Sequence, residues 1–81
     1  IEMHRTATEF ADMTLIETFG RNVRQARKDK GWTQEQLAFE AGVKRAYLSE
    51  VENGQRNVSL DVAEKLARAL DVEPSTLMAS A

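Results

Sequence analysis

The sequence predicts an all-α fold of five helices that follow an N-terminal extension. Helix-favouring residues, mainly Leu, Ala, Glu, Lys, Arg and Gln, dominate the 81 residues, and no run of alternating β-branched residues predicts a strand. Several stretches carry apolar residues at helical spacing, and glycines stand where two of them end. With 42% hydrophobic residues, the chain has room for one domain with a single small core.

Residues 32–57 contain two short helices joined by a tight turn. Thr33 has a side chain suited to the N-cap of the first helix, and Gln36 follows three positions later as its capping-box partner. Gly42 tolerates the positive φ of the turn. The second helix is expected from about Lys44 to Glu52, ending at Asn53-Gly54. At 100° per residue, Leu48 and Val51 face inward, whereas four residues face outward: Arg45, Ala46, Ser49 and Glu50.

Three further helices are expected to hold this pair in place. The first begins near Thr14 or Leu15 and carries an apolar stripe that predicts core residues: Leu15, Ile16, Phe19, Val23 and Ala26. Ser59 caps the fourth helix, whose core stripe is Ala63, Leu66, Ala67 and Leu70. Pro74 opens a short last helix. Its Leu77 and Met78 either close the core or lie in a dimer interface.

Residues 1–13 form the predicted extension, and residues 14–81 form the predicted five-helix domain. The extension is acidic and begins without methionine, so we expect a processed or truncated start. It either docks as a helix through Phe10 and Met13 or frays as a terminus does. No function is assigned to it.

Composition argues against several classes of protein. The chain has no cysteine and a single histidine, His4, so neither a disulfide nor a metal site is expected, and no cofactor is predicted. The sequence contains neither a nucleophile paired with a general base nor a glycine-rich phosphate loop, so an enzyme is not expected. Neither a signal peptide nor an apolar run of roughly 18 residues is present, so a soluble cytoplasmic protein without a membrane partner is expected.

The charge is unevenly distributed along the chain. The total is −2, but residues 20–57 hold eight basic and five acidic residues, a local charge of +3. A polyanion meets one face of a protein, so this local excess matters more than the total. It predicts moderate, salt-sensitive binding to nucleic acid. On the reverse of the first helix, Arg21, Arg24 and Lys28 either meet phosphates or form a solvated face.

The run GWTQEQLAFEAGVKRAYLSEVENGQRNVSLDVAEKLARALDV, residues 31–72, resembles the Cro/C1-type (Xre-like) helix-turn-helix family. The resemblance implies a five-helix, lambda-repressor-like domain that regulates transcription as a dimer, with its third helix in the DNA major groove. Within the family, the segments TQEQLA, KRAYLSEVE and GQRNVSL are similar to those of the small controller proteins of restriction-modification systems.

Roles for individual residues follow from this resemblance. Gln34 corresponds to a glutamine that contacts a phosphate, and Arg45 to the main base-reading residue, which can bond guanine O6 and N7. Ala46 and Ser49 are expected at a thymine methyl group or base edge. Four residues are expected mainly to position the DNA backbone: Lys44, Tyr47, Arg56 and Asn57. The alternatives are a solvated Arg45 and a Tyr47 that packs on the helix rim.

Two acidic residues of the same helix have different expected roles. Arg27 lies at the edge of the first apolar stripe and needs a partner, and Glu52 is the candidate both by helical geometry and by the resemblance. Glu50 departs from what a DNA-binding face favours, because an outward carboxylate repels phosphate. It must read a cytosine amino group or stay clear of the DNA.

We therefore expect a sequence-specific regulator that binds double-stranded DNA as a homodimer on a pseudo-palindromic operator. Dimerisation is expected through the last helix and its neighbouring loop. RNA polymerase is a further candidate partner. The alternative is an antitoxin or other protein-binding module, with a toxin protein as its partner and DNA binding as a secondary activity.

Overall fold

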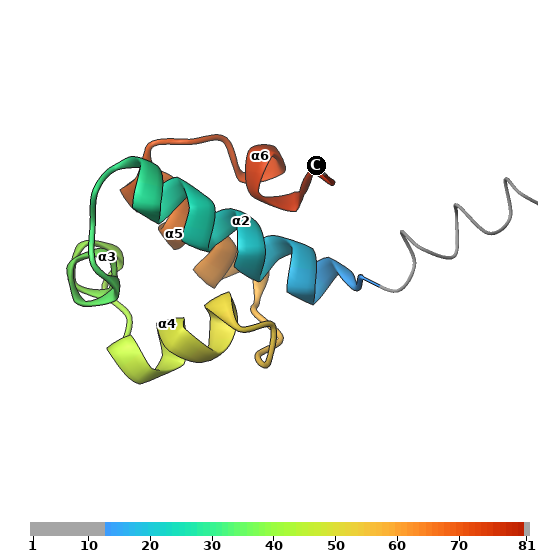
Figure 1. Cartoon of the computed structure of the whole chain (residues 1–81), viewed down its shortest axis with the longest axis horizontal. Helices are drawn as coiled ribbons and strands as arrows, with labels where there is room; N and C mark the ends of the chain where they lie inside the picture. The colour runs from blue at the N-terminus through green and yellow to red at the C-terminus, as the bar shows by residue number, and fades with distance from the viewer. Residues whose placement is uncertain (1–12, 81) are drawn as a thin grey trace, which may run out of the picture.

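A computed structural model describes residues 13–80, in which all regular structure is helical. The helices are α2 (Leu15–Asp29), α3 (Gln34–Ala41), α4 (Arg45–Glu52), α5 (Leu60–Leu70) and α6 (Pro74–Met78) (Figure 1). The predicted all-α, five-helix fold is confirmed over this range. Except for Met13, the predicted extension, including Phe10, lies outside the described residues, and the boundary at residue 13 stays a prediction.

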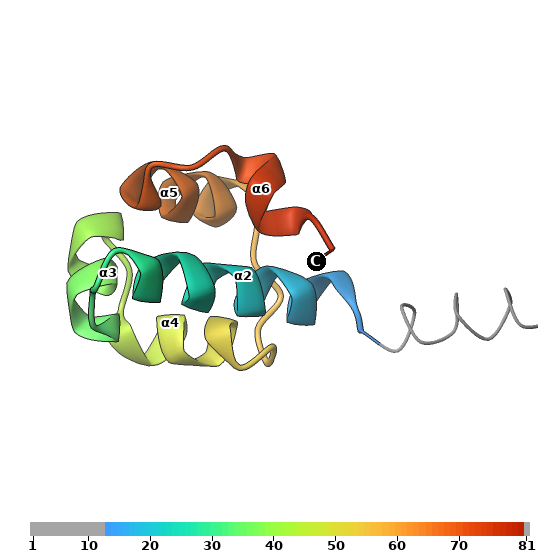
Figure 2. The same ribbon diagram turned by 45° about the horizontal axis from the view of Figure 1, so that its top comes forward.

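Helix α2 lies in the middle of the fold. It contacts α4 on one side and α5 and α6 on the other, while α3 contacts both α4 and α5 at one end (Figure 2). The fully buried side chains come from all five helices: Val23, Leu37, Leu48, Val51, Leu66 and Leu77. A single core therefore joins the pair α3 and α4 to the other three helices.

The helix ends largely follow the predicted caps. The capping box predicted at Thr33 is only half formed: Thr33 Oγ1 accepts a hydrogen bond from the Gln36 backbone at 3.1 Å, but the return bond from the Gln36 side chain is not made. A complete capping box lies at Thr14, with Glu17 as its partner. Gly42 has the positive φ, 72°, that the turn requires. Helix α4 begins at Arg45, one residue later than expected, because Lys44 is extended and serves as its N-cap.

Two residues of the predicted α2 core stripe are not in the core: Ile16 is half-buried and lines a surface groove, and Leu15 is on the surface. Leu15 is 60% exposed, because it is the first residue of α2 and lies beyond the end of the core, which begins near Phe19. At the other end of the chain, Leu77 is buried and closes the core, whereas Met78 is half-buried at its rim. Asn22 holds α6 against α2 by donating to the carbonyl oxygens of Leu77 and Ala79, at 2.8 Å each.

Gly20 has no side chain, so the backbones of α2 and α4 can pack in direct contact at this point. A Cβ at this position would overlap the carbonyl oxygen of Val51 and come within 3.2 Å of the Glu52 backbone. The C-terminal end of α4 therefore rests directly on α2. This contact fixes which face of α4 points outward.

Candidate nucleic-acid interface

The outward face of α4 carries the residues predicted to read DNA. Arg45 and Ala46, on its first turn, are exposed, as is the preceding Lys44. Ser49 is half-buried one turn later, and Tyr47 lies on the shoulder, partly packed against the core. The helix stands at the edge of the molecule, across α2 from α5 and α6, so a partner can approach this face (Figure 2).

A buried ion pair holds α4 from behind. Arg27 donates from Nε to Glu52 Oε2 at 2.7 Å and from Nη2 to Glu52 Oε1 at 3.0 Å. Its Nη1 donates to the carbonyl oxygen of Trp32 at 2.8 Å, in the loop before α3. The two side chains are only 10% and 1% exposed. The predicted partners therefore meet, and this pair ties α2, α4 and the start of α3 together.

Gln34 joins this network from the first residue of α3. Its Nε2 donates to Glu52 Oε1 at 3.0 Å, a bond that uses one of the two N–H groups of the amide. The same residue lines an open hollow with Arg45, Arg27, Thr33 and Glu35. The structure thus brings the predicted phosphate contact and the predicted base reader to one hollow between the starts of α3 and α4.

Arg56 lies beyond the C-terminal end of α4 and packs over it. Its guanidinium stands 5.1 Å from the centre of the Tyr47 ring. It also donates to Glu50 Oε1 from Nε at 2.9 Å and from Nη2 at 2.6 Å. The Glu50 carboxylate is therefore neither free nor unpaired. Sequence reasoning flagged Glu50 but missed this pairing.

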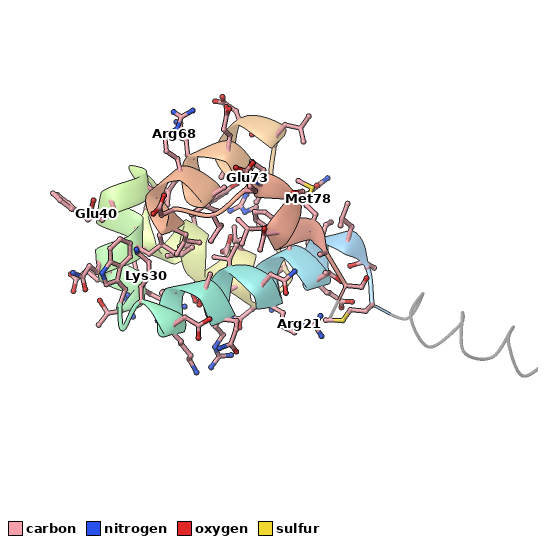
Figure 3. The ribbon with its side chains drawn as sticks, turned by 90° about the horizontal axis from the view of Figure 1, so that it is seen from above. Arg21, Lys30, Glu40, Arg68, Glu73 and Met78 are labelled. Carbon is pink, nitrogen blue, oxygen red and sulfur yellow. The ribbon has the colours of Figure 1, made fainter. Side chains whose placement is uncertain are left out.

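The other cations of this region are on the surface. Arg21, Arg24 and Lys28 are all exposed along α2, and Arg21 points away from α5 and α6 (Figure 3). Lys30 lies over the Trp32 ring at 4.8 Å from its centre. The Arg27–Glu52 and Arg56–Glu50 pairs each carry no net charge. The local excess of +3 thus resides in the remaining charged side chains of residues 20–57.

A second surface feature is the apolar patch, formed by Leu15, Ile16, Val58, Leu60 and Met78. Leu60 is 79% exposed, and these side chains line a groove of about 110 Å³, which Asn57 and Ser59 border. Met78, labelled in Figure 3, is its contribution from α6. Sequence reasoning did not single out Leu60. The sequence feature that could have identified it is its position in the first turn of α5, where a leucine continues the apolar stripe of the helix beyond the end of the core.

Asn57 is the predicted DNA contact that lies next to the apolar patch. It is exposed and borders the apolar patch, whereas Lys44 and Arg45 stand at the opposite end of α4. The predicted contacts therefore follow the length of α4 and the loop after it, not a single point.

Two negative findings concern residues 13–80 only. This part of the chain holds no group of three or more His, Asp or Glu side chains arranged to bind a metal ion. None of its helices has the length and hydrophobicity needed to cross a bilayer.

Comparison with known proteins points to one family. The sequence signature described as Helix-turn-helix matches residues 23–77. Control protein C.BamHI of Bacillus amyloliquefaciens is 51% identical over 61 residues, which make up 74% of this chain and 75% of that protein. The HTH-type transcriptional regulator SinR of Bacillus subtilis is 43% identical over 60 residues, 73% of this chain and 54% of the regulator.

A solved structure gives the same result. The restriction-modification controller protein C.AhdI from Aeromonas hydrophila matches with a TM-score of 0.74 at 52% identity. The match covers 76% of this chain and 94% of that one.

Proposed function

The chain belongs to the helix-turn-helix family and is a DNA-binding transcriptional regulator; from this premise we propose that it acts as a homodimer on a pseudo-palindromic operator. Its similarity to C.BamHI and C.AhdI further supports a controller of a restriction-modification system, and we propose that it regulates its own promoter. Such a protein would work in the cytoplasm, where the DNA is.

The observation that carries the proposal is the rigid presentation of Arg45. Its side chain is exposed on the first turn of α4, and α4 itself is fixed by the buried Arg27–Glu52 pair and by the close packing at Gly20. In the major groove, an arginine in this position would donate two hydrogen bonds to guanine O6 and N7. Ala46 and Ser49, on the same helix, would meet a thymine methyl group or a base edge.

Phosphate contacts would flank this reading helix. The second N–H of the Gln34 amide and the backbone N–H groups at the start of α3 suit an anion next to Arg45. Lys44 at the other side of the turn, and Tyr47, Arg56 and Asn57 toward the far end of α4, would position the DNA backbone.

The apolar patch is the proposed dimer interface. It exposes Leu15 and Leu60, which a monomer leaves in water, and it includes Met78 on α6. Pairing two copies through this patch would give a two-fold dimer with two α4 helices. Two-fold symmetry then requires a pseudo-palindromic operator, and we expect its half-sites about 34 Å apart, one turn of DNA.

Selection of bound sequences from random duplex DNA tests the reading role. We expect a palindrome to be enriched, and Arg45→Ala to lose preference for it while weak, salt-sensitive binding to any DNA survives. Arg68→Ala is the matched control, because it removes an exposed arginine from α5, across α2 from α4. If no sequence is enriched and Arg45→Ala behaves as wild type, the protein-binding alternative, with a toxin as partner, replaces this proposal.

Sedimentation velocity of Leu60→Ser tests the interface. We expect dissociation to monomers and loss of cooperative binding to the palindrome. Phe39→Ser is the control, because Phe39 is 82% exposed on α3 and lies outside the patch. A Leu60→Ser dimer as tight as wild type would exclude this interface. Transcription by purified RNA polymerase from a promoter that bears the palindrome then tests whether the polymerase is a partner.

A further inference from the structure

The side chains of Glu50, Arg56 and Tyr47 form a small cluster on the DNA-facing side of the domain. Arg56 donates twice to one carboxylate oxygen, Glu50 Oε1, at 2.9 and 2.6 Å. The Tyr47 ring lies under the guanidinium, 5.1 Å from Cζ to the ring centre. Arg56 is thus held on two sides, by a charge and by an aromatic face.

The geometry leaves part of each group free. Both bonds use the same carboxylate oxygen, so Glu50 Oε2 and the Arg56 Nη1 group have no partner within the cluster. The two side chains are 45% and 48% exposed, so water reaches the pair and its net strength is small. A DNA phosphate could compete with Glu50 for this arginine on nearly equal terms.

The charges matter more than the strength of the pair. An unpaired arginine at this site would attract any phosphate, whatever the base sequence. Paired with Glu50, the same arginine presents no net charge. Non-specific binding rests almost entirely on such phosphate contacts, whereas operator binding also has the base contacts of Arg45.

We propose that Glu50 is a positioning residue that acts through Arg56. By competing for the guanidinium, it weakens one phosphate contact with any DNA, and so lowers DNA affinity and its salt dependence without changing the base preference. It also removes the conflict between a carboxylate on α4 and the phosphates nearby. The inference rests on the proposed DNA-binding face of α4.

Glu50→Gln tests this role in binding titrations from 50 to 200 mM salt. Releasing Arg56 adds one phosphate contact, so we expect random-duplex affinity to rise roughly fivefold at low salt, the equivalent of one net hydrogen bond. The slope of log K against log salt should steepen by about 0.9, a further loss of about 3.5-fold across that range. Operator affinity should rise by about the same factor, because a phosphate contact carries no sequence information, so the ratio of the two affinities should stay near that of the wild type.

A double-mutant cycle with Arg56→Gln separates this mechanism from simple repulsion by Glu50. If Glu50 acts through Arg56, Glu50→Gln in the Arg56→Gln background leaves random-duplex affinity and salt slope unchanged. If the gain is as large in that background, direct repulsion explains it and the proposal fails. It also fails if Glu50→Gln alone changes neither quantity.

Two controls complete the design. Glu64→Gln removes a matched exposed carboxylate, paired with Arg68 at 3.6 Å on α5, and should bind both DNAs as wild type does. The wild type and Arg45→Ala are titrated alongside. If a selected operator depends on Arg45 but Glu50→Gln binds as wild type does, only the proposed role of Glu50 is refuted. If operator binding does not depend on Arg45, the proposed DNA-binding face itself is refuted.

Discussion

Replacing Glu52 by glutamine should destabilise the domain more than its single-atom change suggests. The carboxylate accepts three hydrogen bonds, two from Arg27 and one from Gln34, and its side chain is only 1% exposed. An amide keeps one acceptor oxygen and turns an N–H group toward the donors around it. The Arg27 guanidinium then stays buried without a counter-charge.

The expected loss is large for a domain of this size. Breaking a buried ion pair by removing one partner costs about 3 to 5 kcal/mol. A domain of the described length is stable by only about 3 to 10 kcal/mol in total. Each kcal/mol shifts the melting temperature of such a domain by about 4 to 8 °C, so Glu52→Gln should melt at least about 12 °C below wild type.

Thermal and urea unfolding followed by circular dichroism provide the measurement. The double variant Arg27→Met, Glu52→Met should recover part of the loss, because apolar side chains of similar length remove both charges. Recovery should stay incomplete, since the Trp32 carbonyl and the Gln34 amide lose their partners. A shift of less than about 4 °C in Glu52→Gln would refute the reasoning that this pair anchors α4.

Two further changes test the packing around α2. Gly20→Ala places a methyl group against the Val51 carbonyl, which cannot rotate away; overpacking of about 3 kcal/mol outweighs the roughly 1 kcal/mol gain in helix propensity, so urea denaturation should show a net loss of about 2 kcal/mol. Equal stability would mean that α4 can move off α2 freely. Asn22→Ala removes the two bonds to the end of α6, so amide exchange around Leu77 should accelerate while α3 and α4 stay protected; unchanged exchange would show that apolar packing alone holds α6.

The sequence was sufficient for contacts that helical periodicity determines. Arg27 and Glu52 each lie at the edge of an apolar stripe, so the rotation of 100° per residue brings them face to face once the stripes pack. The Glu50–Arg56 pair was out of reach by this route. The chain leaves α4 at Asn53 and turns through Gly54, and periodicity gives no direction for the residues that follow.

The position of the core along each helix was also beyond the sequence. Periodicity assigns Leu15 to the correct face of α2 but does not say where neighbouring helices stop covering that face. The same limit applies to Leu60 at the start of α5. Both leucines are exposed for this reason, and their joint exposure in one groove was visible only in three dimensions.

Helix α4 has only eight residues, too few to be stable alone in water, so its orientation comes entirely from tertiary contacts. Glu52 supplies one of these and also fixes the Gln34 amide, 3.0 Å away. One buried carboxylate thus positions both the proposed base-reading helix and the proposed phosphate contact. If Arg45 and Gln34 both contact DNA, Glu52→Gln should weaken operator binding even at temperatures where the variant remains folded. Binding titrations well below its melting temperature, with Arg68→Ala beside it, would reveal this effect; wild-type affinity there would limit Glu52 to a role in stability.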